Sequence, residues 1–307
     1  MHFNIENCNL CPHSCGVNRK MGQLGICRVG IDPLVASIVL HKGEETVISG
    51  EKGVCNVFFA HCNLSCIYCQ NYQISDNRLS DKRWLISYDI IIDSIKRILD
   101  DGVETLGFVS PSHQVYQMVE IINRLNSLGY KPIVVYNTNA YDSVEVLREL
   151  NGLVDIYLPD FKYYSDELAL RYSNVKNYRF IATSAIREMI WQKGTSFQLS
   201  NSGVLSSGVM VRHLVLPGHS KDSIQLLRHI EEEFSSNLSI SLMSQYRPNQ
   251  NLSKKSSINR LLSPNEYEEV VKTLFTLGFH RGYVQDLASN TYYLPDFNAS
   301  KPFFDVF

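Results

Sequence analysis

The sequence contains no cysteine after residue 69, so the last 238 of its 307 residues lack this residue type entirely. The eight cysteines fall into two short groups, one within the first 27 residues and one between residues 55 and 69. A disulfide framework is typical of small secreted domains, in which paired cysteines run through the whole chain. Two tight groups at one end of a longer chain instead predict two metal sites.

The sequence also lacks a long apolar run, a large excess of one charge, and the charged start and apolar core of a signal peptide. The net charge is −2, from 29 basic and 31 acidic residues, which does not suit a dedicated nucleic-acid binder. We therefore expect a soluble, cytoplasmic protein with no membrane and no nucleic acid among its partners.

From residue 53 onward, short apolar runs alternate with segments of helical periodicity. The alternation predicts strands at 53–60, 104–110, 131–139, 154–162, 208–218, 238–246 and 281–286, and helices at 87–102, 113–129, 143–152, 165–193, 221–234 and 263–278. This order predicts an α/β fold with a parallel sheet and right-handed crossovers, as in a partial or full (β/α) barrel of the triosephosphate-isomerase (TIM) type.

Three regions are expected along the chain. Residues 1–46 form a Cys-rich metal-binding extension, which includes a short strand at 34–41. Residues 47–287 form the barrel, and the aromatic tail 288–307 packs on it.

Cys62, Cys66 and Cys69 lie on the loop that follows the first predicted barrel strand. Three thiolates can hold three irons of a four-iron, four-sulfur (4Fe-4S) cluster and leave the fourth iron open. The carboxyl ends of barrel strands are where active sites lie. The alternative is a structural zinc loop with Cys55 as fourth ligand. Cys55 stands in mid-strand among apolar residues, which favours a place in the core.

Polar residues follow or end five further strands, where a barrel would bring them to one rim. They are Ser110, Ser112, His113, Asn137, Thr138, Asn139, Asp160, Lys162, Arg212, His213, His219, Gln245 and Tyr246. Turn formers alone would also give polar strand ends, and a lone histidine such as His113 or His219 is about as often structural as catalytic. Five such strand ends in one fold favour the lining of a site.

These segments resemble the radical S-adenosylmethionine (SAM) superfamily and, within it, the pyruvate formate-lyase activating enzyme group, especially its PflX-type members. The resemblance runs from Cys8 to about Tyr246 and is carried by CNLCPHSCGVNR, ISGEKGVCNVFFAHCNLSCIYCQN, DIYLPDFKY and VRHLVLPG. It implies that the open iron of the cluster binds SAM. An electron from the cluster then cleaves SAM to methionine and a 5′-deoxyadenosyl radical, which abstracts hydrogen.

The resemblance also implies roles for single residues. Cys62, Cys66 and Cys69 would bind the cluster, and Tyr68 would lie against the adenine of SAM. Residues Ser110, Ser112 and His113 lie in the stretch that replaces the Gly-Gly-Glu segment of the family, which receives the amino group of SAM.

Further along, Asn137 and Thr138 take the place of an Asp-Thr pair that helps to hold a monovalent cation. Asp160 and Lys162 match an Asp-x-Lys pair near the methionyl end of SAM, and Arg212 would pair with the SAM carboxylate. The alternative for Lys162 and Arg212 is that they pair with surface acids of the chain itself.

Cys8, Cys11, Cys15 and Cys27 form a second set with metal-ligand spacing. Four thiolates can close a tetrahedral zinc site, or they can hold an auxiliary iron–sulfur cluster. The complete ligand set favours a structural metal slightly, and the residues leave the choice open.

Three functional hypotheses follow. The first is a radical SAM oxidoreductase, similar to activating enzymes of glycyl-radical proteins, that takes hydrogen from a protein or peptide and draws electrons from a flavodoxin- or ferredoxin-type donor. The second is a radical SAM enzyme that acts on a small molecule or another substrate. The third is a non-enzymatic iron–sulfur or zinc protein for electron transfer or binding, which would need no lined pocket at the strand ends.

Overall fold

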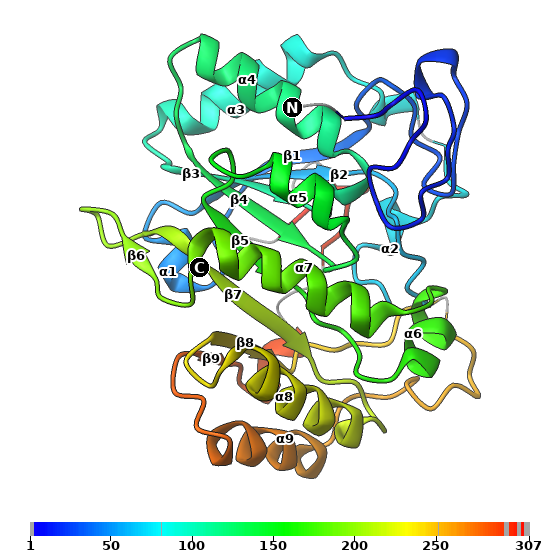
Figure 1. The fold of residues 1–307 in the computed structure, drawn as a ribbon, viewed down its shortest axis with the longest axis vertical. Helices are drawn as coiled ribbons and strands as arrows, with labels where there is room; N and C mark the ends of the chain where they lie inside the picture. Colours follow the sequence, from blue (N-terminus) through cyan, green and yellow to red (C-terminus); the bar gives the residue numbers. More distant parts are fainter. Residues whose placement is uncertain (1–2, 81, 251, 292–294, 300–301, 304–307) are drawn as a thin grey trace.

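The computed structural model describes residues 3–80, 82–250, 252–291, 295–299 and 302–303. Its centre is one curved sheet (Figure 1). The strands of the sheet are β1 (Val35–His41), β2 (Val54–Phe59), β3 (Thr105–Val109), β4 (Ile133–Thr138), β5 (Ile156–Pro159), β6 (Gln198–Leu199), β7 (Leu205–Leu214), β8 (Ser239–Met243) and β9 (Gly282–Val284). None of the helices in the described ranges is both long enough and apolar enough to span a bilayer.

The sheet is parallel from β2 to β9 in the order β2-β3-β4-β5-β7-β8-β9. β1 adds to the β2 edge in antiparallel register, and β6 pairs antiparallel with β7. Among the described residues no pairing joins β1 to β9, so the sheet is a partial barrel. The predicted α/β class and parallel order are confirmed, and the choice between a full and a partial barrel is decided.

Helices connect the parallel strands and cover the outer face of the sheet (Figure 1). The longer ones are α3 (Tyr88–Asp100), α4 (Val115–Ser127), α5 (Val144–Glu149), α6 (Asp166–Ser173), α7 (Tyr178–Lys193), α8 (Ser220–Phe234) and α9 (Pro264–Thr276). The short ones are α1 (Thr46–Ser49), α2 (Tyr72–Ser75) and the 3-10 turns η1 (Arg19–Met21), η2 (Lys82–Trp84), η3 (Pro111–His113) and η4 (Leu287–Thr291). Ser87 and Ser263 cap α3 and α9 by accepting backbone hydrogen bonds, as their sequence positions indicate.

The sheet begins before the predicted boundary at residue 46. β1 lies inside the segment expected to be a separate extension, and it pairs with β2 along most of its length. At the other end of the chain, the rings of Phe297 and Phe303 contact Phe58 of β2. The described part of the tail therefore packs on β2, next to the edge strand β1.

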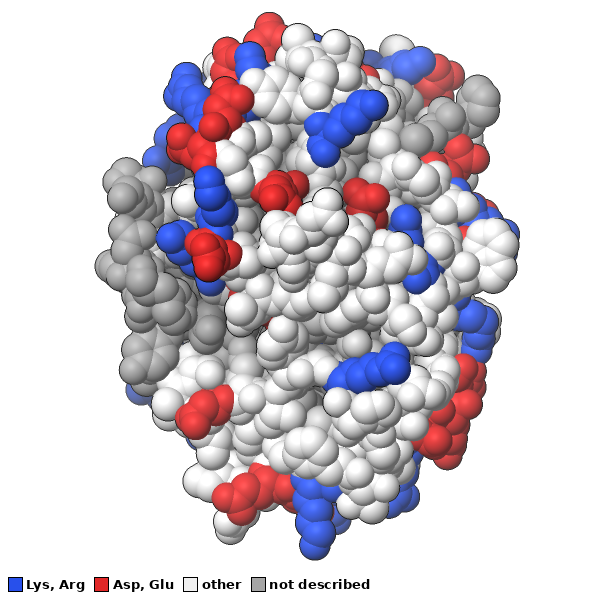
Figure 2. Space-filling model, turned by 90° about the vertical axis from the view of Figure 1, so that its left-hand side faces the viewer, with Lys and Arg blue, Asp and Glu red and all other residues white. Residues whose placement is uncertain are grey.

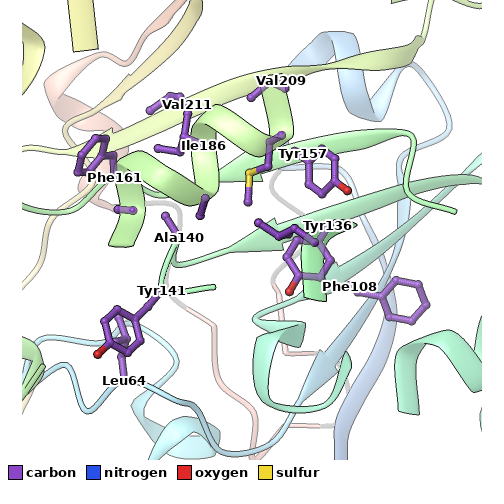
Figure 3. Packing of buried hydrophobic residues seen from close by; sticks show 14 of the residues in the cluster. Leu64, Phe108, Tyr136, Ala140, Tyr141, Tyr157, Phe161, Ile186, Val209 and Val211 are labelled. Atoms are coloured by element: carbon purple, nitrogen blue, oxygen red, sulfur yellow. The ribbon is translucent and has the colours of Figure 1, made fainter. Parts of the chain in front are cut away.

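Two apolar layers hold the sheet in place. Outside it, Tyr136 and Tyr157 project from neighbouring strands with ring centroids 5.9 Å apart, and Ile186 of α7 lies nearby (Figure 3). Inside it, Ile48 of α1 packs with residues near the amino ends of the strands, among them Val54. Burial of one such side chain stabilises the fold by about 1.5–3 kcal/mol. α1 therefore fills the bottom of the partial barrel.

Charged side chains are mixed in sign over the face seen in Figure 2. Lys and Arg alternate with Asp and Glu in its upper and lower parts, and a mostly uncharged band lies between them. No large patch of one sign gathers among the described residues of this face.

Candidate functional site

The carboxyl ends of β2, β3 and β4 each lead into a residue with a left-handed backbone. His61, Ser110 and Ala140 have φ values of 66°, 53° and 61°. A side chain other than glycine is strained in this region, and such strain is often found at functional sites. The same edge of the sheet carries the three-cysteine loop.

Cys62, Cys66 and Cys69 all line one cavity of about 480 Å³ at this edge. The loop is held by its backbone. The amide of Cys62 donates to Asn77 Oδ1 at 2.9 Å, and the amide of Ile67 donates to the carbonyl of Tyr172 at 2.9 Å. The end of α6 and the segment after α2 therefore position the three sulfurs.

Each of the three sulfurs has a polar neighbour. Asn139 Nδ2 donates to the sulfur of Cys62 at 3.5 Å, and Ser75 Oγ donates to that of Cys69 at 3.2 Å. The sulfur of Cys66 lies 2.9 Å from Ser173 Oγ. Burial raises the pKa of the Cys62 thiol to about 12 and that of Cys66 to about 11. Without a metal these groups are neutral thiols, and a metal would bind them as thiolates that the nearby donors stabilise.

A chain of hydroxyl groups extends from Cys66 into the core. Ser173 Oγ lies 2.7 Å from the hydroxyl of Tyr163, which lies 2.6 Å from the hydroxyl of Tyr68. Each hydroxyl has a single hydrogen to donate. In one arrangement Tyr163 donates to Tyr68, and each group donates to the next one further from a protonated Cys66. If Cys66 is a thiolate, Ser173 donates to it and the order of donors along the chain reverses.

Most of the predicted strand-end residues share the cavity with the sulfurs. Those in its lining are Ser110, Asn137, Asn139, Asp160, Lys162, Arg212 and Gln245, together with Tyr68 of the cysteine loop. The cavity thus collects residues from β2, β3, β4, β5 and β7, as parallel strands of a barrel should.

Ser112, His113 and Thr138, which we expected beside them, stand outside this lining. All three are buried. Ser112 Oγ lies 3.1 Å from Thr138 Oγ1, which donates to Asp142 at 2.6 Å. His113 Nε2 lies 2.9 Å from the carbonyl of Ala60. These side chains hold the strand-end turns together behind the cavity.

Lys162 and Asp160 form a short ion pair in the cavity wall, with Nζ and Oδ2 2.7 Å apart. Burial alone would lower the pKa of Lys162, but the carboxylate of Asp160 and the sulfur of Cys66 raise it above its usual value. Lys162 is therefore a fixed positive charge close to the cysteines.

Arg212 binds two carboxylates of this chain, where we had expected it to pair with the carboxylate of SAM. Its guanidinium donates to Glu44 and to Glu45, with Nε to Glu45 Oε1 at 2.9 Å. Glu44 also accepts from Asn56 Nδ2 at 2.9 Å. The pairing with acids of the chain was the alternative reading of the sequence, but these acids are largely buried in the barrel and not on the surface.

The Glu44–Arg212 pair makes the stability of the fold depend on pH. Burial alone would raise the pKa of Glu44, but Arg212, His41 and Asn56 together lower it well below the ordinary value of 4.5. Ionised Glu44 therefore stabilises the fold above pH 4.5, and this contribution is lost as the pH falls. We expect the melting temperature to fall less steeply between about pH 5 and about pH 2 in Glu44→Gln than in the wild type. The exposed Glu51→Gln is the matched control, and equal slopes in all three proteins would contradict the account.

Several site residues had no clear signal in the sequence. Ser75 and Ser173 lie outside the three-cysteine motif, and only the fold brings them to the sulfurs. Glu44 and Glu45 precede a four-residue helix and give no periodic pattern. The adjacent acids before the apolar stretch of α1 were the one available hint.

A larger hollow, of about 940 Å³, lies on the outside of the molecule beside α5 and α7. Its lining includes Phe180 and Trp191 but none of the cysteines. Both spaces have charged residues in their walls, but the thiols gather in the smaller cavity, so the chemistry is assigned there.

Residues 56–230 match the family model of the Radical SAM superfamily. The matched span is more than half of the chain and contains the three-cysteine loop. The chain belongs to the radical SAM superfamily. It is also 31% identical over 278 residues to the Uncharacterized protein MJ0674 of Methanocaldococcus jannaschii, which covers 88% of this chain and 74% of the relative.

Two solved structures share the radical SAM fold with this chain. Native anSMEcpe with bound AdoMet is 14% identical with a TM-score of 0.50, over 73% of this chain and 61% of that one. The FeFe-hydrogenase maturase HydG from Carboxydothermus hydrogenoformans is 17% identical with a TM-score of 0.51, over 78% and 55%. This chain therefore spans less than two thirds of either one, and at these identities the likeness concerns the fold alone.

The residues in the cavity fit the cluster and the SAM that a radical SAM protein uses. Three thiols meet at one cavity, each with a polar neighbour, and the cavity continues past them along Ser110, Asn137 and Lys162. No three His, Cys, Asp or Glu side chains in the described part of the chain are arranged around a single ion. A 4Fe-4S cluster does not require that arrangement, because each thiolate binds a different iron.

Proposed function

We propose that this chain is a radical SAM enzyme in which Cys62, Cys66 and Cys69 hold a 4Fe-4S cluster with one iron open for SAM. The observation that carries the proposal is a set of three thiols, without a fourth, in the wall of one cavity. Cys55 belongs to the core packed under the outer helices and does not line the cavity. This placement favours an open cluster over a four-ligand zinc loop.

When bound, the cluster supplies an electron that cleaves SAM to methionine and a 5′-deoxyadenosyl radical, which abstracts hydrogen from the substrate. The protein residues position SAM. Lys162 offers a positive charge, and Ser110 and Asn137 offer neutral hydrogen-bonding groups to the polar methionyl end. Tyr68 offers a ring in the same wall, and Arg212 is held in place by Glu44 and Glu45. A flavodoxin- or ferredoxin-type protein is the proposed source of the electron.

The proposed substrate is a protein or peptide segment. Since β1 and β9 are not paired in the described structure, the sheet itself does not close the cavity on that side, which supports access for an extended segment. A small-molecule substrate is the second candidate. It is favoured by Pro295 and Phe303 of the tail, which line the same cavity and narrow it.

The two substrates can be distinguished by the source of the abstracted hydrogen. Cells grown in deuterated medium are separated into a macromolecular fraction and a small-molecule filtrate, and each is added to the reduced enzyme with SAM. Deuterium should enter 5′-deoxyadenosine from the macromolecular fraction. Deuterium from the filtrate alone would replace the peptide proposal by the small-molecule one.

Ser173 is expected to tune the reduction potential of the cluster. Its hydroxyl is the polar neighbour of the Cys66 sulfur, and hydrogen bonds to cluster sulfurs set the potential. Ser173→Ala should keep the iron content and shift the potential to a more negative value, as measured by a redox titration followed by electron paramagnetic resonance. Ser184→Ala, on the outer face of α7, is the control. An unchanged potential in Ser173→Ala would refute this role.

A further inference from the structure

A buried arginine lies in the N-terminal four-cysteine region without a carboxylate partner among its hydrogen bonds. Arg19 is buried, with only 2% of its surface exposed. Its guanidinium donates to the sulfur of Cys8 at 3.2 Å, to the sulfur of Cys27 at 3.6 Å and to the carbonyl of His113 at 2.9 Å. Two of these three acceptors are cysteines that the sequence marks as metal ligands.

The charge of Arg19 requires a negative partner. A guanidinium stays protonated in proteins, and a buried charge is strongly unfavourable unless an opposite charge compensates it. Neutral thiols are weak acceptors and carry no charge. Four thiolates around one Zn²⁺ leave two negative charges, and four thiolates around an iron–sulfur cluster are also anionic.

We propose that Cys8, Cys11, Cys15 and Cys27 hold a metal centre as thiolates, and that Arg19 is its charge partner. All four cysteines and Arg19 line one small internal space. Their sulfurs are not already arranged around one ion in the described structure. What indicates the metal is the donor set together with the charge of Arg19, which has no carboxylate partner among the hydrogen bonds of the described residues. Zinc and an iron–sulfur cluster share this thiolate chemistry.

The proposed centre lies against the three-cysteine loop of the radical SAM site. His13 Nε2 is 2.7 Å from the carbonyl of Asn63, and His61 Nδ1 is 2.9 Å from the carbonyl of Cys27. Asn77 Nδ2 donates to the carbonyl of Ile26 at 3.1 Å and to that of Cys62 at 2.8 Å. A metal that orders residues 8–27 therefore also braces the loop that carries Cys62.

The test counts metal where the radical SAM cluster cannot contribute. Cys62, Cys66 and Cys69 are all replaced by alanine, and zinc, iron and sulfide are measured in protein purified without oxygen. We expect either one zinc or a cluster's iron and sulfide per chain, lost when Cys11→Ser and Cys15→Ser are added and kept in Cys55→Ala. A folded protein with neither metal would overturn the proposal, whatever the outcome for SAM cleavage. If the triple variant does not fold, zinc and iron are measured in the wild type instead. Their sum per chain must then exceed the four irons of one 4Fe-4S cluster.

The role of Arg19 has its own test. In competition with a chelator, Arg19→Met should bind the metal about 10- to 100-fold more weakly than the parent protein does. Removal of an outer partner of a metal site commonly has an effect of this size. Arg19→Lys, which keeps the charge, should restore part of the affinity. Equal metal retention in the parent and in Arg19→Met, with the fold confirmed by circular dichroism, would reject Arg19 as the charge partner.

Discussion

Replacing Cys66 by alanine is expected to reduce the formation of 5′-deoxyadenosine from SAM to less than about 1% of the wild-type rate. Loss of an outer partner alone commonly weakens a metal site 10- to 100-fold, and loss of a ligand removes a bond to iron itself. The cavity lining holds no cysteine besides Cys62, Cys66 and Cys69, so no neighbouring thiol replaces Cys66. The measurement is chromatography of the products after anaerobic reconstitution and reduction with dithionite.

The matched control for this change is Cys55→Ala. Cys55 is fully buried, and it does not line the cavity. The Cys55→Ala variant should keep the absorption of the cluster and the rate of SAM cleavage near wild-type levels. If Cys66→Ala retained cleavage, or if Cys55→Ala abolished both the cluster and cleavage in a folded protein, the assignment of the open cluster to the three-cysteine loop would be wrong.

Arg212→Met is expected to destabilise the fold by about 3–5 kcal/mol, the usual effect of removing one partner from a buried ion pair. The change leaves Glu44 and Glu45 buried without their cation. For a chain of this size that corresponds to a fall of roughly 5–8 °C in melting temperature. Calorimetry or thermal denaturation followed by circular dichroism would measure it.

The rescue variant distinguishes this ion pairing from other effects of losing Arg212. When Glu44→Gln and Glu45→Gln are combined with Arg212→Met, no buried charge remains in the group, and most of the lost stability should return. A melting temperature in Arg212→Met within about 2 °C of the wild type would show that the three charges do not depend on one another.

The strands and helices could be predicted because each carries a local signal. The apolar runs of β3 and β4 and the serine caps of α3 and α9 are visible within a few residues of sequence. The partial closure of the barrel could not be predicted, because it depends on whether β1 and β9, far apart in the chain, meet. For the same reason β1 was assigned to an extension, although its strand character was clear.

The site was predictable where barrel geometry alone determines position. Ser110, Asn137, Asp160 and Lys162 line the cavity because each directly follows or ends a parallel strand. Ser112 and His113 do not, because the left-handed turn at Ser110 directs the residues after it into the core. The partners of Arg212 were not predictable, since Glu44 and Glu45 lie on the loop before α1, which reaches Arg212 from the opposite end of the barrel.

The central claim is that this chain cleaves SAM reductively at the Cys62–Cys66–Cys69 site. The most direct measurement is the yield of 5′-deoxyadenosine and methionine from SAM, using anaerobically reconstituted wild-type protein with and without dithionite. We predict equal amounts of both products, formed only in the reduced sample and absent from Cys66→Ala. A reduced, cluster-loaded protein that releases no 5′-deoxyadenosine from SAM would contradict the account.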